Sequence, residues 1–121
     1  MTHYIGTDII EISRIKQAID RWGERFLHRV YTQPEINLYG RSLPSLAARF
    51  ACKEAVMKLL GMDNSGISWQ DIETLSCPGG KPLLNLYGRA GREASKLGIK
   101  EIVVSLSHSR DYAMATAIGA N

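Results

Sequence analysis

The chain has 121 residues, of which 45% are hydrophobic and 22% are charged, and its formal net charge is +3. This composition excludes a mainly disordered chain, and the length predicts one domain over residues 1–121. The modest positive charge favours an acidic partner but falls short of the dense Lys and Arg content of a dedicated nucleic-acid binder, so we expect no nucleic acid as partner.

The N-terminal part of the chain predicts a strand and then an amphipathic helix. β-Branched residues dominate residues 4–12, which is typical of a strand. Ser13 is the expected N-cap of a helix over residues 14–30, in which apolar residues recur at spacings of three and four. Gly23 is a point at which this helix could break in two.

A longer helix is expected in the middle of the chain. After a short helical piece near Pro34, Pro44 stands where a helix commonly begins, and Gly61 is a natural end. Small or apolar residues surround nearly the whole circumference of residues 45–60. We therefore expect this helix to be packed on several sides at the centre of the domain.

The second half of the chain predicts two strand pairs with a helix between them. A loop rich in Gly, Ser and Asn follows the long helix, and a cluster of turn-forming residues separates the first two strands. The expected elements are strands at 71–76 and 83–86, a helix at 87–97, and strands at 101–107 and 112–118. The fold class is therefore α+β, with a mainly antiparallel sheet packed against the long central helix.

No segment predicts secretion or a membrane span. The N-terminus lacks a basic region followed by an apolar one, and no apolar run approaches the roughly 18 residues that cross a bilayer. Cys52 and Cys77 have neither the spacing of a zinc site nor the number of a disulfide framework. We expect a cytoplasmic protein with reduced thiols and no membrane partner.

Two carboxylates stand in otherwise apolar surroundings. Asp8 interrupts the first strand and Glu54 lies on the long helix, and a buried carboxylate without a partner costs several kcal/mol. Asp8 could cap a turn or pair with an arginine, and Glu54 could pair with Lys58 one helical turn later. Alternatively the two acids, with Lys53 and Lys58 nearby, suit a magnesium site that receives phosphate groups.

Two further segments carry polar groups. Ser107, His108 and Ser109 lie at a strand end, where they could hydrogen-bond a phosphate or serve only in local structure. The sequence around Gly80 and Lys81 lacks the glycine spacing and the hydroxyl of a Walker A loop, so a tight turn is its default interpretation.

Residues 5–12 (IGTDIIEI) and 49–58 (RFACKEAVMK) resemble the two signature segments of the small holo-acyl-carrier-protein synthases, a branch of the phosphopantetheinyl transferases. Residues 104–109 and 80–82 resemble weaker segments of that family, in matching order. The resemblance implies the 4'-phosphopantetheinyl transferase fold. It also implies transfer of 4'-phosphopantetheine from coenzyme A to a serine of apo acyl carrier protein in fatty acid biosynthesis, with adenosine 3',5'-bisphosphate as the other product.

The resemblance also assigns roles to residues. Asp8 and Glu54 would bind Mg²⁺, and with Lys58, which would face the phosphates, they are the implied catalytic set. The residues implied to contact or border coenzyme A are Arg49, Lys53, Gly80, Lys81, Pro82, Ser107, His108 and Ser109.

Similar enzymes are homotrimers with active sites between protomers, and their basic first helix receives the carrier protein. Arg14, Arg21 and Arg25 match that role, although without the resemblance they would be an ordinary solvated face. The sequence departs from the family in two places, since Cys52 stands where alanine is usual and residues 32–45 form a shortened segment. Neither departure touches the implied magnesium ligands.

Two other functions remain open at this point. A magnesium-dependent hydrolase of nucleotide pyrophosphates could use the same carboxylates and would need no carrier protein. A non-catalytic module could bind an acidic protein or RNA through the basic helix, but only 7% of the residues are aromatic, which is few for an RNA reader.

Overall fold

The computed structural model describes residues 1–62 and 68–121, and the predicted Gly/Ser/Asn loop falls partly on residues 63–67, outside the described residues. The helices are α1 (Ile12–Trp22), α2 (Glu24–Val30), α3 (Gln33–Tyr39), α4 (Leu43–Leu59), the short 3-10 helix η1 (Trp69–Asp71) and α5 (Gly88–Lys96). The strands are β1 (His3–Glu11), β2 (Ile72–Ser76), β3 (Pro82–Leu86), β4 (Glu101–His108) and β5 (Tyr112–Ala120).

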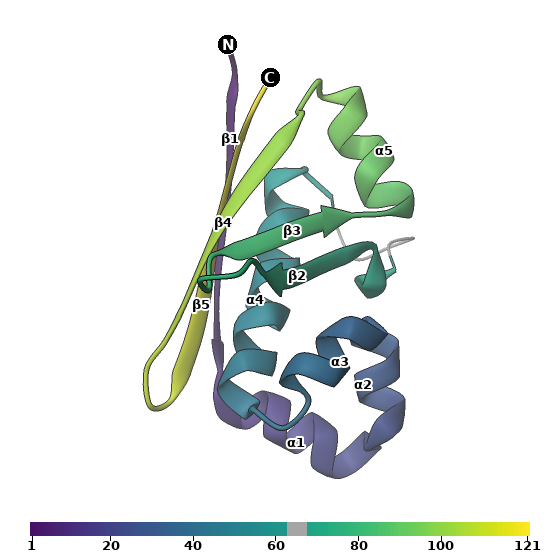
Figure 1. The fold of residues 1–121 in the computed structure, drawn as a ribbon, viewed down its shortest axis with the longest axis vertical. Helices are drawn as coiled ribbons and strands as arrows, with labels where there is room; N and C mark the ends of the chain where they lie inside the picture. The colour runs from purple at the N-terminus through teal and green to yellow at the C-terminus, as the bar shows by residue number, and fades with distance from the viewer. Residues whose placement is uncertain (63–67) are drawn as a thin grey trace.

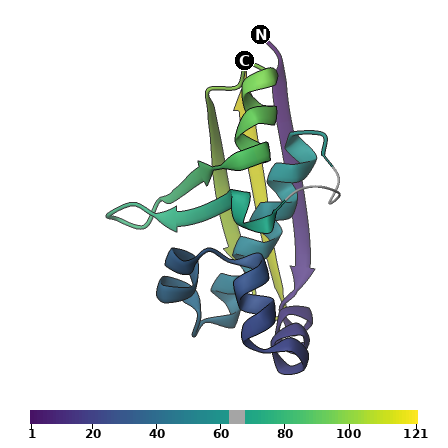
Figure 2. The same cartoon turned by 90° about the vertical axis from the view of Figure 1, so that its right-hand side faces the viewer.

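The strands form two antiparallel sheets, and the α+β class is confirmed (Figure 1). One sheet has the strand order β1-β5-β4, and the other is the β2-β3 hairpin. Figure 2 shows α4 lying across one face of the three-stranded sheet, with α1 to α3 gathered at one end and both chain termini at the other. The predicted arrangement of an antiparallel sheet against a long central helix is therefore correct.

Helix α4 begins two residues before its predicted start and ends one residue before its predicted end, with the expected signals at both ends. The Ser42 side chain accepts a hydrogen bond from the backbone N–H of Ser45, Pro44 lies in the first turn, and Gly61 follows the helix with a positive φ of 69°. The helix is buried on nearly all sides, because the sheet, the hairpin and α1 all pack against it. None of the described helices is long and apolar enough to cross a membrane.

The helix predicted over residues 14–30 starts earlier than expected, and it breaks at Gly23 as expected. Helix α1 begins at Ile12, so Ser13 is inside the helix and is not the N-cap. The backbone N–H of Ile12 donates to the carbonyl of Asp111, 2.8 Å away, a tertiary bond that no local pattern reveals. Gly23, with φ 58°, separates α1 from α2, and Trp22 beside it is 51% exposed.

Candidate active site

A close approach of backbones brings the first strand onto the central helix. A Cβ atom placed on Gly6 of β1 would lie 1.8 Å from the carbonyl oxygen of Ala55 on α4, so only glycine fits there. Opposite β1, the inner face of β5 carries the fully buried Ala113, Ala115 and Ala117, which leave the same room for the helix. Small residues on both strands thus set how near Asp8 can come to α4.

Asp8 points toward α4 and meets Lys58. The Lys58 ammonium lies 3.1 Å from Oδ1 of Asp8 and also donates to the carbonyl of Thr7 at 3.0 Å. The Asp8 side chain is 19% exposed and that of Lys58 is 55% exposed, so the pair borders solvent. Asp8 therefore has a lysine partner, and Lys58 is not paired with Glu54 as the simplest helical interpretation suggested.

Glu54 is half-buried beside this pair. Burial raises the pKa of Glu54 above its ordinary value, the negative charge of Asp8 raises it further, and Lys58 acts in the opposite direction. No side chain or backbone group of the described residues donates a hydrogen bond to its carboxylate in the structure. The site thus holds two mutually repelling carboxylates, and Lys58 is paired with Asp8 and not with Glu54.

The two carboxylates open into a cleft of about 340 Å³. Six of its nine lining residues are apolar, and its charged members are Asp8, Glu54 and Arg14. Phe50 forms part of the wall and stacks on Trp69, with ring centroids 4.9 Å apart. A cleft with apolar walls and a few convergent charged groups is the usual form of a site for a small charged substrate.

The donor set of this cleft fits a magnesium ion better than a softer metal. Magnesium commonly takes one or two protein carboxylates and completes its shell with water and substrate phosphate oxygens. Asp8 and Glu54 supply two carboxylates, and their mutual repulsion would be relieved by a divalent cation. Among residues 1–62 and 68–121, no cluster of three or more His, Cys, Asp or Glu side chains could hold a metal by protein ligands alone.

The structure contradicts the expected phosphate contact of Lys53. This side chain is fully buried on the opposite side of α4, where its ammonium lies 2.9 Å from Oε1 of Glu35 and donates to the carbonyls of Trp69 and Ile72. Burial lowers the pKa of Lys53, and the charge of Glu35 opposes that shift. Because all three protons of its ammonium are used in these hydrogen bonds, Lys53 is a structural residue of the core and takes no part in the carboxylate cleft.

Arg49 is also engaged within the fold. Its guanidinium lies 3.3 Å from the ring centroid of Tyr39 and donates from Nε to the carbonyl of Thr74 at 3.0 Å. Only 8% of the residue is exposed, and it does not line the carboxylate cleft. We therefore assign it no phosphate contact in a single chain.

The remaining residues implied to contact coenzyme A lie outside the cleft. Ser107, His108 and Ser109 are exposed at the β4–β5 turn, with β5 between them and β1. Residues 80–82 form the turn side of the β2-β3 hairpin, where Lys81 is exposed. A single chain does not bring either segment to Asp8 and Glu54.

The three arginines of the basic face take different positions. Arg14 lines the carboxylate cleft itself, Arg21 lies over the ring of Trp22 at 4.9 Å, and Arg25 belongs to α2 because the chain breaks at Gly23. All three are exposed. They are consistent with an acidic partner that docks beside the cleft.

Sequence reasoning missed two residues on which the fold around the site depends. Gly6 gave no signal beyond its place in the strand, because its role depends on a helix that is distant in sequence. Glu35 was hidden in a short helix, yet it is fully buried and accepts hydrogen bonds from the backbone of Thr32 and Thr74. A glutamate three residues after Thr32 is the signature of a capping box, and this could have marked Glu35 as structural.

Comparisons with known proteins agree with this geometry. The family model of the 4'-phosphopantetheinyl transferase superfamily matches residues 4–117. A holo-acyl-carrier-protein synthase of Dehalococcoides mccartyi is 56% identical over 115 residues, covering 95% of this chain and 96% of the relative. A protein of the same name from Herpetosiphon aurantiacus is 48% identical over 121 residues, covering 94% and 95%.

Solved structures give the same result. The holo-acyl-carrier-protein synthase of Helicobacter pylori in complex with coenzyme A superposes with a TM-score of 0.86 at 31% identity, covering 96% of this chain and 99% of that one. The enzyme of Neisseria meningitidis gives a TM-score of 0.86 at 31% identity, covering 98% of each chain. This chain therefore belongs to the 4'-phosphopantetheinyl transferase superfamily, among the holo-acyl-carrier-protein synthases.

Proposed function

We propose that this chain transfers the 4'-phosphopantetheine group from coenzyme A to a serine of apo acyl carrier protein, with Asp8, Glu54 and Lys58 as its catalytic residues. The observation that carries the proposal is the cleft that Asp8 and Glu54 line, with the Lys58 ammonium 3.1 Å from Asp8. Its support from relatives is their name, holo-acyl-carrier-protein synthase, and the coenzyme A present in the Helicobacter pylori complex.

Asp8 and Glu54 are the residues that would hold Mg²⁺. A magnesium ion held by them would neutralise charge on the pyrophosphate of coenzyme A and would make its phosphorus easier to attack. Lys58 donates hydrogen bonds to Asp8 and to the carbonyl of Thr7, which hold its ammonium beside Asp8. Its remaining proton is free to reach a phosphate oxygen.

The transfer forms one bond and breaks one. The serine Oγ of the carrier protein bonds to the β-phosphorus of coenzyme A, and the bond between that phosphorus and the bridging oxygen breaks. The bridging oxygen leaves with adenosine 3',5'-bisphosphate, and Lys58 stabilises the negative charge that develops on it. The serine proton passes to an oxygen acceptor in the cleft, where Asp8 and Glu54 supply the carboxylates.

A homotrimer would complete the site, and the outer sheet face supports one. Ile5, Ile118 and Val103 stand side by side on β1, β5 and β4, and they are 67%, 45% and 46% exposed. A row of aliphatic side chains across three strands is typical of a face that another subunit covers. In such a trimer His108 with its flanking serines, and residues 80–82, come from a neighbouring copy and bind the 3'-phosphate of coenzyme A.

The acidic carrier protein docks on Arg14, Arg21 and Arg25. Arg14 lies at the cleft, so a helix of negative charge bound to these arginines would present its serine to the phosphates. We place the reaction in the cytoplasm, in fatty acid biosynthesis, and assign it to one phosphopantetheinyl transferase domain over residues 1–121.

Chromatography that measures the release of adenosine 3',5'-bisphosphate distinguishes this transferase from a pyrophosphate hydrolase. The protein is incubated with coenzyme A and magnesium, with apo acyl carrier protein or without it. A transferase releases the nucleotide only when the carrier is present. Equal release without the carrier would mean that the cleft hydrolyses a pyrophosphate and that the proposal is wrong.

A further inference from the structure

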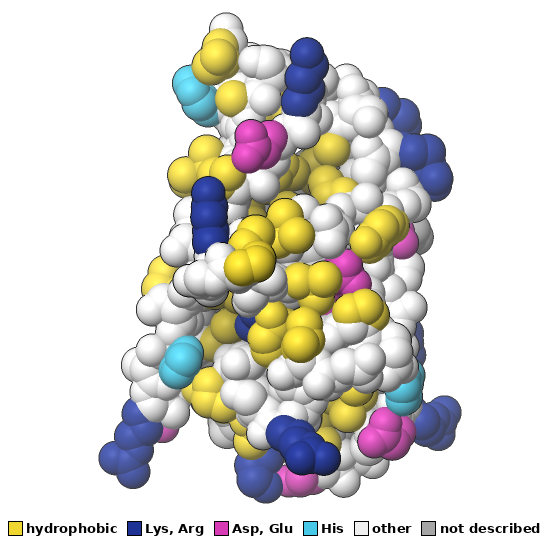
Figure 3. All heavy atoms as spheres, in the orientation of Figure 1, with side chains coloured by type: hydrophobic (Ala, Val, Ile, Leu, Met, Phe, Trp, Pro, Cys, Tyr) yellow, Lys and Arg dark blue, Asp and Glu magenta, His cyan; other side chains and the backbone are white. Residues whose placement is uncertain are grey.

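A second hollow lies between β3, β4 and α5, away from the carboxylate cleft. It has a volume of about 920 Å³, and Figure 3 shows apolar side chains gathered in it and over β3. Leu83 on its border is 44% exposed. Helix α5 contributes the small Gly91 and Ala94 to this hollow, so the helix does not fill it.

Both strands that border the hollow present an edge to it. Four consecutive residues of β4, Glu101 to Val104, line it, as do Pro82, Leu83 and Leu84 of β3. Side chains of consecutive strand residues point to opposite faces, so a hollow that touches all of them meets the edge of the strand. Within the described chain β4 is hydrogen-bonded only to β5, and β3 only to β2. β3 and β4 lie in contact with each other over part of their length, and away from that contact the N–H and C=O groups of the β4 edge have no strand partner among the described residues.

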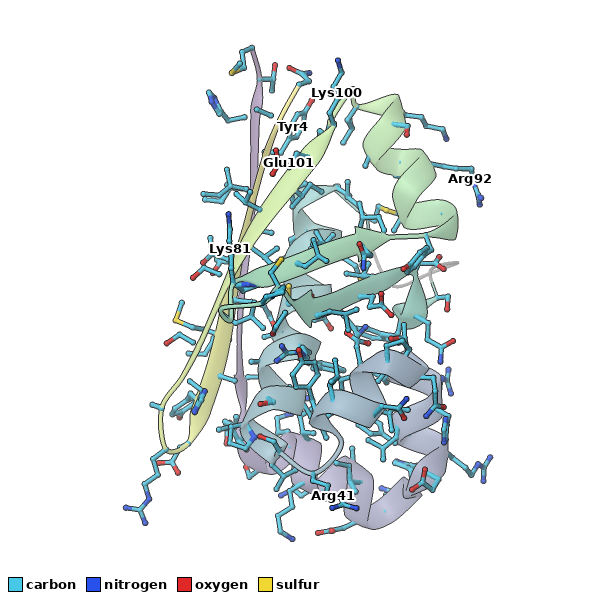
Figure 4. All side chains as sticks on the ribbon, viewed as in Figure 1. Tyr4, Arg41, Lys81, Arg92, Lys100 and Glu101 are labelled. Carbon is cyan, nitrogen blue, oxygen red and sulfur yellow. The ribbon has the colours of Figure 1, made fainter. Side chains whose placement is uncertain are left out.

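The rim of the hollow is positively charged. Lys81, Arg92, Lys96 and Lys100 line it against the single carboxylate of Glu101. Lys96 is paired with Glu93 at 3.2 Å, whereas Lys81, Arg92 and Lys100 have no ion pair with any described residue. Figure 4 places Lys81 beside β4 at the hairpin end, Lys100 at the opposite end where α5 leads into β4, and Arg92 on α5.

The chemistry of the walls selects the kind of occupant. An alkyl chain laid in the hollow would remove water from the open strand edges and give their N–H and C=O groups no replacement, at a cost of about 1–3 kcal/mol for each group. An extended peptide supplies those hydrogen bonds while its apolar side chains cover the leucines. Four residues of β4 span roughly 13 Å, so acidic side chains at the two ends of such a peptide would meet Lys81 and Lys100.

We propose that this hollow, which we name the β4 groove, binds an acidic extended segment of a partner protein as an added strand on the free edge of β4. This binding is separate from the transfer reaction and goes beyond it. Apart from Lys81 and Pro82, no residue of the β4 groove is among those assigned to coenzyme A or the carrier protein.

The probe is the labelled peptide acetyl-Glu-Val-Leu-Val-Glu-amide, and its binding to the whole protein is measured by fluorescence anisotropy. Two versions of the peptide carry N-methyl groups, one on the first, third and fifth residues and the other on the second and fourth. In an extended peptide alternate N–H groups point the same way, so one N-methylated version should lose binding and the other should keep it. Equal behaviour of the two versions would overturn strand addition.

Charge variants test the rim. The double change Arg92→Glu and Lys100→Glu should weaken peptide binding by about tenfold or more, since each reversal turns an attraction into a repulsion. Arg41→Glu is the matched control, because Arg41 lies at the opposite end of the molecule, and it should leave binding unchanged (Figure 4). Equal binding of the lysine analogue, acetyl-Lys-Val-Leu-Val-Lys-amide, would contradict the acidic preference.

A steric variant tests the position of the peptide. A Cβ atom on Gly91 would lie 3.6 Å from the nearest described atom, the carbonyl oxygen of Leu86, so Gly91→Ala is expected to fold and to bind. Gly91→Leu places its longer side chain in the groove and should abolish binding, with circular dichroism as the check on folding. Binding of decanoate without binding of the peptide would overturn the proposal. The proposal would also be overturned if the protein formed a concentration-dependent dimer and the Arg92→Glu, Lys100→Glu variant did not, because a second copy would then occupy the groove.

Discussion

The ammonium of Lys58 lies 3.1 Å from Oδ1 of Asp8, a residue 50 positions away in sequence, although Glu54 is only one helical turn from Lys58. The pair joins α4 to β1, and its Asp8 lines the carboxylate cleft. It leaves Glu54 without a lysine of its own, in a setting that disfavours its negative charge. A cation that both acids can share is what this arrangement lacks.

Replacing Lys58 with methionine removes the positive charge at the cleft and keeps the length of the side chain. We expect kcat for phosphopantetheine transfer to fall by about a hundredfold or more, as for the loss of one stabilising donor in a transition state. Because the pair borders solvent, the free energy of unfolding should change by less than about 1 kcal/mol. Steady-state kinetics and urea unfolding give the two numbers.

Lys96→Met is the control for that experiment, since Lys96 is an exposed lysine with an acidic partner far from the cleft. It should keep the full kcat. A Lys58→Met enzyme that turns over as fast as the parent would remove Lys58 from the catalytic set.

The contact between Gly6 and α4 predicts a second effect. Gly6→Ala puts a methyl group against the backbone carbonyl of Ala55, and overpacking of this kind costs about 1–3 kcal/mol. As β1 moves away from α4, Asp8 separates from Lys58, so transfer activity should fall as well. Urea unfolding and an activity assay on Gly6→Ala, with Gly91→Ala as the glycine control, would show whether both effects occur together.

The buried ion pair of Lys53 and Glu35 predicts a stability effect without a substrate effect. Lys53→Met leaves the Glu35 carboxylate buried without its cation and should lower the free energy of unfolding by about 3–5 kcal/mol. The double variant Lys53→Met with Glu35→Gln should recover part of this loss. The KM for coenzyme A, measured on folded protein, should stay unchanged, and a tenfold rise would restore Lys53 as a phosphate contact.

The sequence predicted most of the fold but only part of the candidate site. Hydrophobic periodicity and turn residues predicted the long helix, both antiparallel strand pairs and the break at Gly23, because those signals are local. The sequence also identified Asp8 and Glu54 as unusual acids, and the structure brings both into one cleft. It could not decide which lysine faces that cleft, because Lys53 and Lys58 lie on different sides of α4 and only tertiary packing distinguishes the sides.

A pH effect on stability is expected from Glu73 on β2. Burial raises the pKa of Glu73, but hydrogen bonds from Thr32, Asn85 and Tyr87 lower it more, so the pKa is below its ordinary value. A carboxyl group whose pKa is lower in the folded protein than in the unfolded chain stabilises the fold. This stabilisation is complete at pH values above the unfolded-chain pKa of about 4.3, and it is lost as the pH falls through the pKa of the folded protein.

Glu73→Gln should therefore be less stable than the parent near neutral pH, and the difference should narrow as the pH falls below about 4. Urea unfolding of both proteins over a pH series measures this difference. A constant difference at all pH values would mean that the ionised carboxylate contributes nothing specific.

The outer sheet face makes a prediction about assembly. Ile118→Lys places a charge in the middle of the exposed aliphatic row and should convert a trimer to monomers in sedimentation velocity. Transfer activity should fall with it, because His108 would no longer meet the carboxylates of a neighbour. Leu38→Lys is the control, since Leu38 is 63% exposed on α3, outside the sheet. A parent protein that sediments as a monomer while fully active would refute the shared site.

The most direct measurement of the central claim is the mass of apo acyl carrier protein after incubation with this protein, coenzyme A and magnesium. The proposed function predicts that the carrier gains the mass of one phosphopantetheinyl group. It also predicts that the gain is absent with Asp8→Ala or Glu54→Ala enzyme that remains folded. A carrier whose mass does not change, or one modified equally by those two variants, would contradict the account.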